Sequence, residues 1–169
     1  TCRRWRRHSY HISSTSVYGT QSVVVDEDCS LEELRPQSPY AETKLKEERY
    51  LQVLGASEGL RFVICRFGTI CGMSPGMRFQ TAINKFCWLA ALNKPLTVWD
   101  SALNSKRPYL GLDDCIRAYQ FFEKNGKLGE VYNVLTNNFE MKEIIETIRS
   151  YNPDLKIEIT KSPLLNQKP

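Results

Sequence analysis

The sequence lacks the features of a membrane-spanning protein, of a secreted protein and of a metal-binding protein. No apolar run approaches the roughly 18 residues that a membrane-spanning helix needs, and no apolar stretch follows the basic N-terminus as in a secretory signal. The six cysteines form no C-x-x-C pair and have no histidine at metal-ligand spacing. We therefore expect reduced thiols, no metal, no membrane and a cytoplasmic location, with disulfides as the minor alternative.

Positive charge is also missing from most of the chain. The formal net charge is +4, and the basic residues Arg3, Arg4, Arg6 and Arg7 supply all of it. A body without net positive charge argues against a nucleic-acid partner. We interpret residues 1–11 as an atypical basic segment. It is either a tail for an acidic partner or, as we favour, a sequence accident such as a misread exon edge.

Glycine is present but not where a dinucleotide would need it. The nine glycines are scattered over 169 residues, and none forms the strand–turn–helix fingerprint on which a dinucleotide pyrophosphate rests. The length suits one ordinary domain, and a hydrophobic content of 41% is enough for a buried core.

The most informative stretch is Ser38–Lys44, S-P-Y-A-E-T-K, which predicts the first turn of a helix. Ser38 is a favoured N-cap, and Pro39 fits the first helical position. Tyr40 and Lys44 are four residues apart and share one helix face. An ammonium beside a phenol favours the ionised form, so such a pair can exchange a proton with an alcohol while a cofactor exchanges the hydride. Taken alone, the pattern more often marks a core aromatic residue beside a solvated lysine.

Upstream, residues 12–19 read I-S-S-T-S-V-Y-G, which predicts a strand end that runs into a Ser/Thr-rich loop. Followed by S-P-Y-x-x-x-K, this loop resembles the extended short-chain dehydrogenase/reductase family, and more closely its NAD-dependent nucleotide-sugar epimerase/dehydratase branch. The resemblance implies a catalytic triad of Ser14, Tyr40 and Lys44. It also implies a fragment, because the family's glycine-rich N-terminal half has no counterpart here.

The resemblance implies an α/β fold: the C-terminal half of a doubly wound Rossmann-type parallel sheet plus a small α/β substrate domain. We expect residues 12–72 to form the second half of the NAD-binding domain. Residues 73–169 should be mainly the substrate-binding region, with interleaved Rossmann elements. The helix that starts at Pro39 and carries Tyr40, which we call the tyrosine helix, would end at Gly55 or Gly59. Further along, the patterns predict a buried parallel strand at 61–71, a helix after 78, a strand at 96–99, a helix at 113–123, a strand at 130–135, a helix at 141–151 and a last strand at 156–160.

Helical spacing also predicts which face of the tyrosine helix is buried. Tyr50, Val53 and Leu54 should pack against the sheet, with Glu47 and Glu48 outward.

The resemblance assigns binding roles as well. NAD, or NADP, is expected to contact Ile12, Ser13, Tyr40, Lys44, Phe67 and Gly68. The choice between the two depends on an acidic residue in the absent half. A nucleotide-diphosphate sugar is expected to contact Thr15, Thr69, Arg78 and Arg107. Arg107 lies in a stretch similar to the family's R-x-Y-x-H-V-x-D, where the arginine pairs with the substrate diphosphate. Thr69 replaces the family's usual Asn.

The reaction that the resemblance implies is epimerisation: a sugar hydroxyl is transiently oxidised to a ketone and the hydride is returned. In the dehydratase branch, carboxylates directly follow the triad Ser or Thr. Here those places are Thr15 and Ser16, neither of which is a base near pH 7, so dehydration is disfavoured. Two alternatives stay open: an NAD(P)-dependent reductase of the same fold, and a non-catalytic remnant without the cofactor loop. We expect the isolated fragment to be inactive. We also expect that the protein can form a homodimer through the tyrosine helix.

Overall fold

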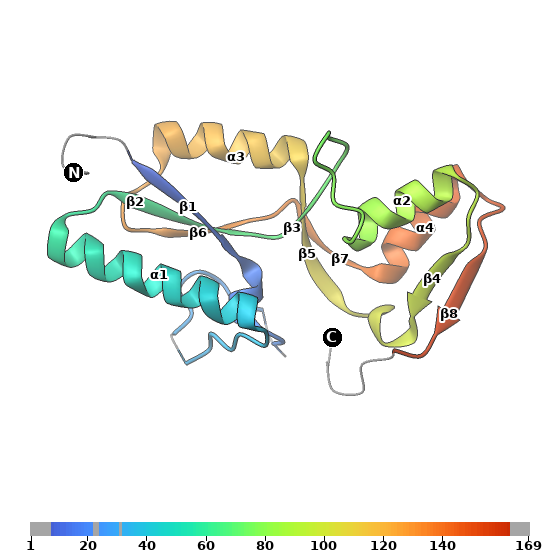
Figure 1. Ribbon diagram of the computed structural model, residues 1–169, viewed down its shortest axis with the longest axis horizontal. Coiled ribbons are helices and arrows are strands. Elements are labelled where there is room, and N and C mark those ends of the chain that lie inside the picture. The colour runs from blue at the N-terminus through green and yellow to red at the C-terminus, as the bar shows by residue number, and fades with distance from the viewer. Residues whose placement is uncertain (1–7, 22–23, 31, 163–169) are drawn as a thin grey trace. The chain divides into compact units, whose positions relative to one another are not determined.

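The computed structural model describes residues 8–21, 24–30 and 32–162. Most of the basic segment predicted at the N-terminus, residues 1–7, lies outside the described residues. Helices and mostly parallel strands alternate along the described chain (Figure 1), which agrees with the α/β class predicted from the sequence.

The chain divides into two compact units. Unit 1 comprises residues 1–68 and 113–134, and unit 2 comprises residues 69–112 and 135–169. The peptide bond between Gly68 and Thr69 is therefore one of the places where the chain passes from one unit to the other.

Unit 1 is built on a parallel sheet of strand order β1-β2-β6, with β1 at Ser9–Ser14, β2 at Phe62–Phe67 and β6 at Val131–Val134. Helices α1 (Pro39–Glu58) and α3 (Leu112–Asn125) cover opposite faces of this sheet (Figure 1). Every residue of β2 is buried, as predicted for a central parallel strand with a helix on each side.

The two faces of β2 differ in chemistry because successive side chains of a strand point in opposite directions. Phe67 packs edge-on against Tyr119 of α3, with ring centroids 5.7 Å apart. Its neighbour Arg66 points the other way and forms an ion pair with Glu48 of α1. The α3 side of this strand is therefore apolar, whereas the α1 side contains buried charge.

Helix α1 begins and ends where the sequence predicts. The Ser38 hydroxyl accepts a hydrogen bond from the Ala41 amide at 3.2 Å, and Pro39 occupies the first helical position. Gly59 closes the helix with φ of 68°, a left-handed conformation that glycine adopts without a steric cost.

The predicted packing face of α1 is wrong for Tyr50, Val53 and Glu48, whereas Leu54 is half-buried. Tyr50 and Val53 are 65% and 60% exposed, whereas Glu48 is only 2% exposed. The helix residues that are buried are Ala41, Leu45 and Glu48. The prediction placed Glu48 outward from helical spacing, and an isolated carboxylate does cost free energy to bury. It did not foresee that Arg66, in a distant strand, would pair with that carboxylate.

The described residues of unit 2 form two small sheets. Strand β5 (Lys106–Gly111) pairs in parallel with β3 (Thr69–Cys71) and antiparallel with β7 (Asn137–Glu140). Strand β4 (Leu96–Trp99) pairs in parallel with β8 (Ile157–Thr160). The single strand predicted at 61–71 is thus two strands, β2 and β3, in different sheets.

Helices α2 (Ala82–Ala91) and α4 (Met141–Tyr151) bury the core of unit 2 against the strands. Ile144, Ile145 and Ile148 of α4 are buried, as their spacing predicts. They pack in one cluster with Leu96 and Val98 of β4.

Candidate active site

Predicted site residues gather at the carboxyl edge of the unit 1 sheet. Ile12, Ser13 and Ser14 end β1, and Phe67 ends β2, with Gly68 directly after it. The parallel register places Ser14 opposite Phe67. The carboxyl ends of parallel strands are where open α/β sheets bind their ligands.

Ser14 is held by the short 3₁₀ helix that follows it, η2 (Thr15–Tyr18). The Ser14 hydroxyl oxygen accepts one hydrogen bond from the Ser16 amide at 3.2 Å and a second from the Ser16 hydroxyl at 2.9 Å. A serine hydroxyl has two acceptor positions and one proton to donate. With both of these bonds donated by Ser16, the Ser14 hydroxyl proton stays available for donation to a ligand.

Thr15 has a different partner. Its hydroxyl donates to the backbone carbonyl of Phe67 at 3.2 Å. This bond ties the start of η2 to the end of β2, so the loop after β1 is fixed at the same edge as Gly68. The side chains of Thr15 and Ser16 offer hydroxyls here and no carboxylate.

Tyr40 and Lys44 occupy the first two turns of α1, the helix that packs against β1 and η2. The Tyr40 side chain is 58% exposed, so its ring is not sealed in the interior. Lys44 is partly buried, and its ammonium donates to Glu47 Oε2 at 2.8 Å. An ammonium has three protons to donate, so this bond leaves the cation able to contact further acceptors.

Glu47 lies between Lys44 and a histidine of β1. His11 Nε2 is 3.3 Å from Glu47 Oε2. Burial, and then the nearby Lys44 charge, lower the pKa of His11, while Glu47 and Glu48 oppose this shift. The hydrogen bond from Lys44 lowers the pKa of Glu47. His11 is therefore neutral and Glu47 is ionised near pH 7.

A buried polar network, which the sequence analysis missed, lies directly beneath this edge. Arg66 Nε donates to both carboxylate oxygens of Glu48, at 3.1 and 3.2 Å, and Nη2 donates to Oε2 at 2.7 Å. Ser13 donates its hydroxyl proton to Glu48 Oε1. All three residues are buried. A basic residue within the otherwise apolar run F-V-I-C-R-F was the signal that could have revealed it, since buried charges are almost always paired.

The network continues to the Tyr of the V-Y-G stretch. Arg66 Nη1 donates to the Tyr18 hydroxyl at 2.8 Å, and its guanidinium carbon lies 4.8 Å from the Tyr18 ring centroid. Tyr18 in turn donates to Asn133 Oδ1 of β6 at 2.9 Å. Burial raises the pKa of Tyr18, although the Arg66 contact opposes the shift. Tyr18 is therefore neutral and structural at pH 7.

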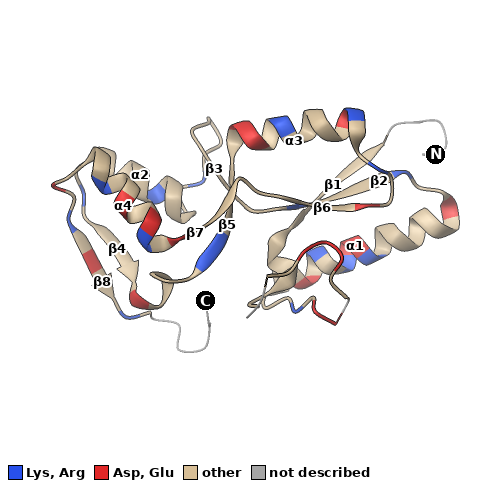
Figure 2. Cartoon of the chain, turned by 180° about the vertical axis from the view of Figure 1, so that it is seen from behind, with Lys and Arg blue, Asp and Glu red and all other residues tan. Residues whose placement is uncertain are grey.

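Of the four predicted substrate contacts, Thr15 belongs to unit 1. The other three, Thr69, Arg78 and Arg107, belong to unit 2. All three are exposed. Thr69 begins β3, and Arg107 lies near the start of β5, the basic end that is blue in Figure 2.

The backbone of the loop that carries Arg78 is fixed from within. The buried Asn84 side chain donates to the Arg78 carbonyl at 3.2 Å and accepts from the Gly72 amide at 3.0 Å. The Thr81 hydroxyl donates to the same Arg78 carbonyl at 2.9 Å. Arg78 is therefore presented on a loop whose two ends are held together by Asn84.

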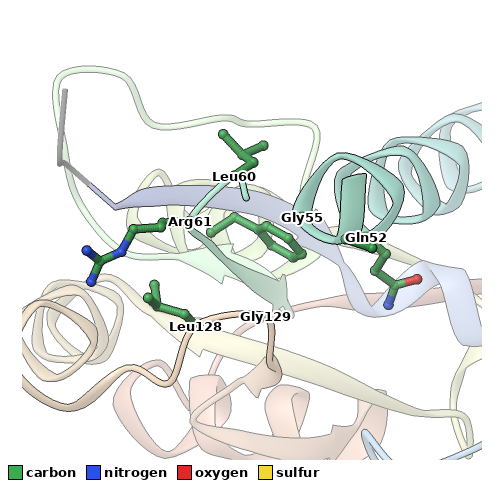
Figure 3. Close-up of a pocket in the computed structure, with 8 residues that line it drawn as sticks. Gln52, Gly55, Leu60, Arg61, Leu128 and Gly129 are labelled. Atoms are coloured by element: carbon green, nitrogen blue, oxygen red, sulfur yellow. The ribbon is translucent and has the colours of Figure 1, made fainter. Parts of the chain in front are cut away.

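A cavity of about 310 Å³ lies at the opposite end of β2 (Figure 3). It is lined by residues around the end of α1, the start of β2 and the loop before β6, among them Gln52, Gly55, Leu60, Arg61, Leu128 and Gly129. Leu60 and Arg61 precede β2, so the cavity is at the amino edge of the sheet. It includes none of the predicted site residues.

In the ranges that the structure describes, no group of three or more His, Cys, Asp or Glu side chains could hold a metal ion. In the same ranges, no helix combines the length and the apolar character that crossing a bilayer requires. The described cysteines are all free thiols.

The parallel sheet of unit 1, with a helix on each face and polar groups at its carboxyl edge, is an α/β fold of Rossmann type. The chain belongs to the NAD dependent epimerase/dehydratase family, whose model matches residues 1–134. This match confirms the family resemblance that residues 12–19 and 38–44 predicted.

Individual relatives agree with this assignment. The chain is 33% identical over 135 residues to an uncharacterized UDP-glucose epimerase, YtcB, of Bacillus subtilis, which covers 79% of this chain and 41% of that protein. It is 30% identical over 154 residues to the dTDP-D-glucose 4,6-dehydratase of Homo sapiens, with 88% and 42% covered. The structure is similar to that of UDP-glucuronic acid 4-epimerase from Bacillus cereus in complex with UDP-glucuronic acid and NAD, with a TM-score of 0.79 at 30% identity, covering 92% of this chain and 49% of that one. The chain thus spans about two fifths of the length of these two curated relatives.

Proposed function

We propose that this chain forms part of an NAD-dependent nucleotide-sugar epimerase in which Ser14, Tyr40 and Lys44 carry the proton chemistry. One observation carries the proposal: Ser14 ends β1, and Tyr40 and Lys44 start the helix that packs against β1 and η2. The relatives named as UDP-glucose and UDP-glucuronic acid epimerases support the same reaction class.

The residues at this edge fit a nicotinamide dinucleotide, NAD or NADP. Rossmann-type sheets bind dinucleotides beyond the carboxyl ends of their strands, which is where Ile12, Ser13, Phe67 and Gly68 lie. The Lys44 ammonium is a suitable donor for sugar hydroxyls such as those of a nicotinamide ribose. When bound, the nicotinamide supplies the acceptor for a hydride from the sugar carbon.

The side chains of the chain supply the proton transfer. In our proposal, Ser14 donates a hydrogen bond to the oxygen of the reacting sugar carbon and keeps its proton, while Ser16 holds the Ser14 oxygen in place. Tyr40, as the phenolate, takes the proton of the same sugar hydroxyl and later returns it. Lys44, on the same helix face, stabilises the negative charge that the Tyr40 oxygen carries before the proton arrives and again after the proton is returned.

We propose epimerisation rather than dehydration, although one relative is named a dehydratase. Loss of water needs an additional acid and base, and the positions after Ser14 supply the hydroxyls of Thr15 and Ser16. The Thr15 hydroxyl is in addition bonded to the Phe67 carbonyl. Neither hydroxyl removes a carbon-bound proton near pH 7.

For the substrate, we propose a nucleotide-diphosphate sugar that contacts Thr15, Thr69, Arg78 and Arg107. Guanidinium groups bind diphosphate oxygens in bidentate pairs. The hydrogen bonds of Asn84 support this role for Arg78, because they fix its loop in advance of binding. We accordingly keep residues 12–72 as part of the cofactor-binding domain and residues 73–169 as the mainly substrate-binding region.

Because the isolated fragment is expected to be inactive, the proposal is tested on a longer form of the protein that includes a glycine-rich dinucleotide-binding half. This form is incubated with NAD and a panel of UDP- and dTDP-sugars, and the sugar proton signals are followed by NMR. Formation of an epimer without net NADH accumulation supports it. Net consumption of NADH or NADPH with a carbonyl compound indicates a reductase instead. Appearance of a 4-keto-6-deoxy sugar indicates dehydration and contradicts the role given to Thr15 and Ser16.

A further inference from the structure

The buried ion pair between Glu48 and Arg66 lies directly beneath the residues that the proposed function uses. Glu48 is 2% exposed and Arg66 is 4% exposed, and three N–H···O contacts join them. A buried ion pair is weak evidence for stability, because the loss of hydration offsets the attraction between the charges. The role of this pair follows from what else the two side chains contact.

Glu48 connects the strand of Ser14 with the helix of Tyr40. Its carboxylate accepts the hydroxyl proton of Ser13, the residue directly before Ser14. On α1, Glu48 follows Lys44 by about one helical turn and Tyr40 by about two. One carboxylate therefore joins both of the elements on which the proposed triad depends.

Arg66 extends the connection to the rest of the sheet edge. It directly precedes Phe67, and its Nη1 donates to the Tyr18 hydroxyl of η2 at 2.8 Å. Tyr18 then donates to Asn133 of β6 at 2.9 Å. Directional bonds between buried groups thus fix α1, η2 and the three strands of the sheet relative to one another.

We propose that Glu48 is a positioning residue that sets the distance between Ser14 and Tyr40, and that Arg66 holds its carboxylate in the orientation that this needs. The catalytic meaning of the inference rests on the proposed function. An apolar pair of similar volume fills the same space without buried charge, but it offers Ser13 no acceptor. Such a pair restores the stability of the protein without restoring the geometry of the site.

The test compares the wild type with Glu48→Gln and with the double variant Glu48→Met/Arg66→Met. Glu58→Gln is the matched control, because Glu58 is an exposed carboxylate at the end of the same helix. Urea unfolding measures stability. Native-state amide hydrogen exchange measures the order of residues 14–16, and NMR of the Tyr40 ring measures its surroundings.

We expect Glu48→Gln to unfold at a lower urea concentration and the double variant to recover the wild-type midpoint. In the double variant, the amides of residues 14–16 should exchange at least about tenfold faster, since local opening no longer breaks the bond from Ser13, and the Tyr40 ring signals should move. Glu48→Gln keeps an oxygen that accepts from Ser13, so its exchange should lie between that of the wild type and that of the double variant. Glu58→Gln should match the wild type throughout. A double variant with wild-type exchange and wild-type Tyr40 signals overturns the inference. It decides the question even where Glu48→Gln does not fold.

Turnover, measured in the longer form of the protein that includes a dinucleotide-binding half, adds a second readout. A displacement of about 1 Å in a catalytic group costs about 100-fold in rate, so the double variant should lose about that factor in kcat while KM changes little. An unchanged kcat in the folded double variant overturns the inference. If the wild-type sequence turns over no nucleotide sugar in the longer form of the protein, this contradicts the proposed function alone, because the exchange and ring measurements do not depend on turnover.

Discussion

Removal of the Tyr40 hydroxyl tests whether this residue has a catalytic role or only a structural role. Tyr40 is 58% exposed, and it lies in the first turn of α1, whose cap is made by Ser38 and Ala41 instead. A surface substitution of this kind changes the free energy of unfolding by at most about 0.5 kcal/mol. Tyr40→Phe should therefore unfold at the same urea concentration as the wild type, to within that limit.

The effect on the reaction should be much larger. A positioned proton donor or acceptor contributes about 10²–10⁴ in rate, which corresponds to about 2.7–5.4 kcal/mol of activation free energy. We expect Tyr40→Phe to lose at least about 100-fold in kcat, measured by NMR of sugar epimers in a form of the protein that turns over. Tyr50→Phe, at an exposed position on the same helix, is the control and should keep wild-type turnover. Unchanged kcat in Tyr40→Phe would refute the assignment of the phenol as the proton carrier.

Further predictions concern the backbone, pH and thiols of the same chain. Gly19→Ala should lose at least about 1–2 kcal/mol in urea unfolding, because Gly19 has φ of 66° and a methyl group there meets a backbone carbonyl at 1.9 Å; Gly76→Ala, with open space around it, should lose far less. Burial and a nearby lysine lower the pKa of His11 below its ordinary 6.5, so the folded state binds this proton less readily than the unfolded state. The resulting stability is complete above pH of about 6.5 and is lost as the pH falls through the lowered value; His11→Gln should flatten this part of a pH series of urea midpoints. Burial raises the pKa of the Cys65 thiol to about 12, so iodoacetamide at pH 8 should leave Cys65 unmodified while the exposed Cys87, whose pKa burial also raises, is alkylated, as judged by mass spectrometry. Alkylation of native Cys65 at the rate of Cys87 would contradict its burial.

Local chemistry made much of unit 1 predictable. Ser38, Pro39 and Gly59 mark the ends of α1, because the conformational preference of each of these residues favours a helix end at its own position. The apolar run at residues 62–67 predicts a buried parallel strand for a similar reason, since β-forming residues without alternation need cover on both faces. Features of this kind depend on residues that are close in the chain.

The buried face of α1 could not be predicted because it depends on a distant partner. Glu48 is inside only because Arg66, 18 positions further along the chain, is inside as well. The same limit applies to β7, whose stretch N-N-F-E has a poor strand propensity. It is a strand because β5 offers it an antiparallel edge, with Arg107 opposite Phe139.

The split of the predicted strand at Gly68 had the same cause. Residues 61–71 read as one run, and only the pairing partners, β6 for β2 and β5 for β3, assign the two parts to different sheets. For the candidate site, the sequence and the family resemblance supplied Ser14, Tyr40 and Lys44. The supporting network could not be found in this way, because its members come from five separate elements.

The order of the two units along the chain has a practical consequence for protein engineering. Unit 1 is interrupted by residues 69–112, so a polypeptide that ends near residue 112 lacks β6 and nearly all of α3. Such a truncation uncovers one face of the central strand β2 and removes β6, one of its two hydrogen-bonded neighbours. A recombinant version of unit 1 alone would instead need residues 69–112 deleted. A designed linker would then join Gly68 to Asp113, so that both segments of unit 1 are encoded in one reading frame.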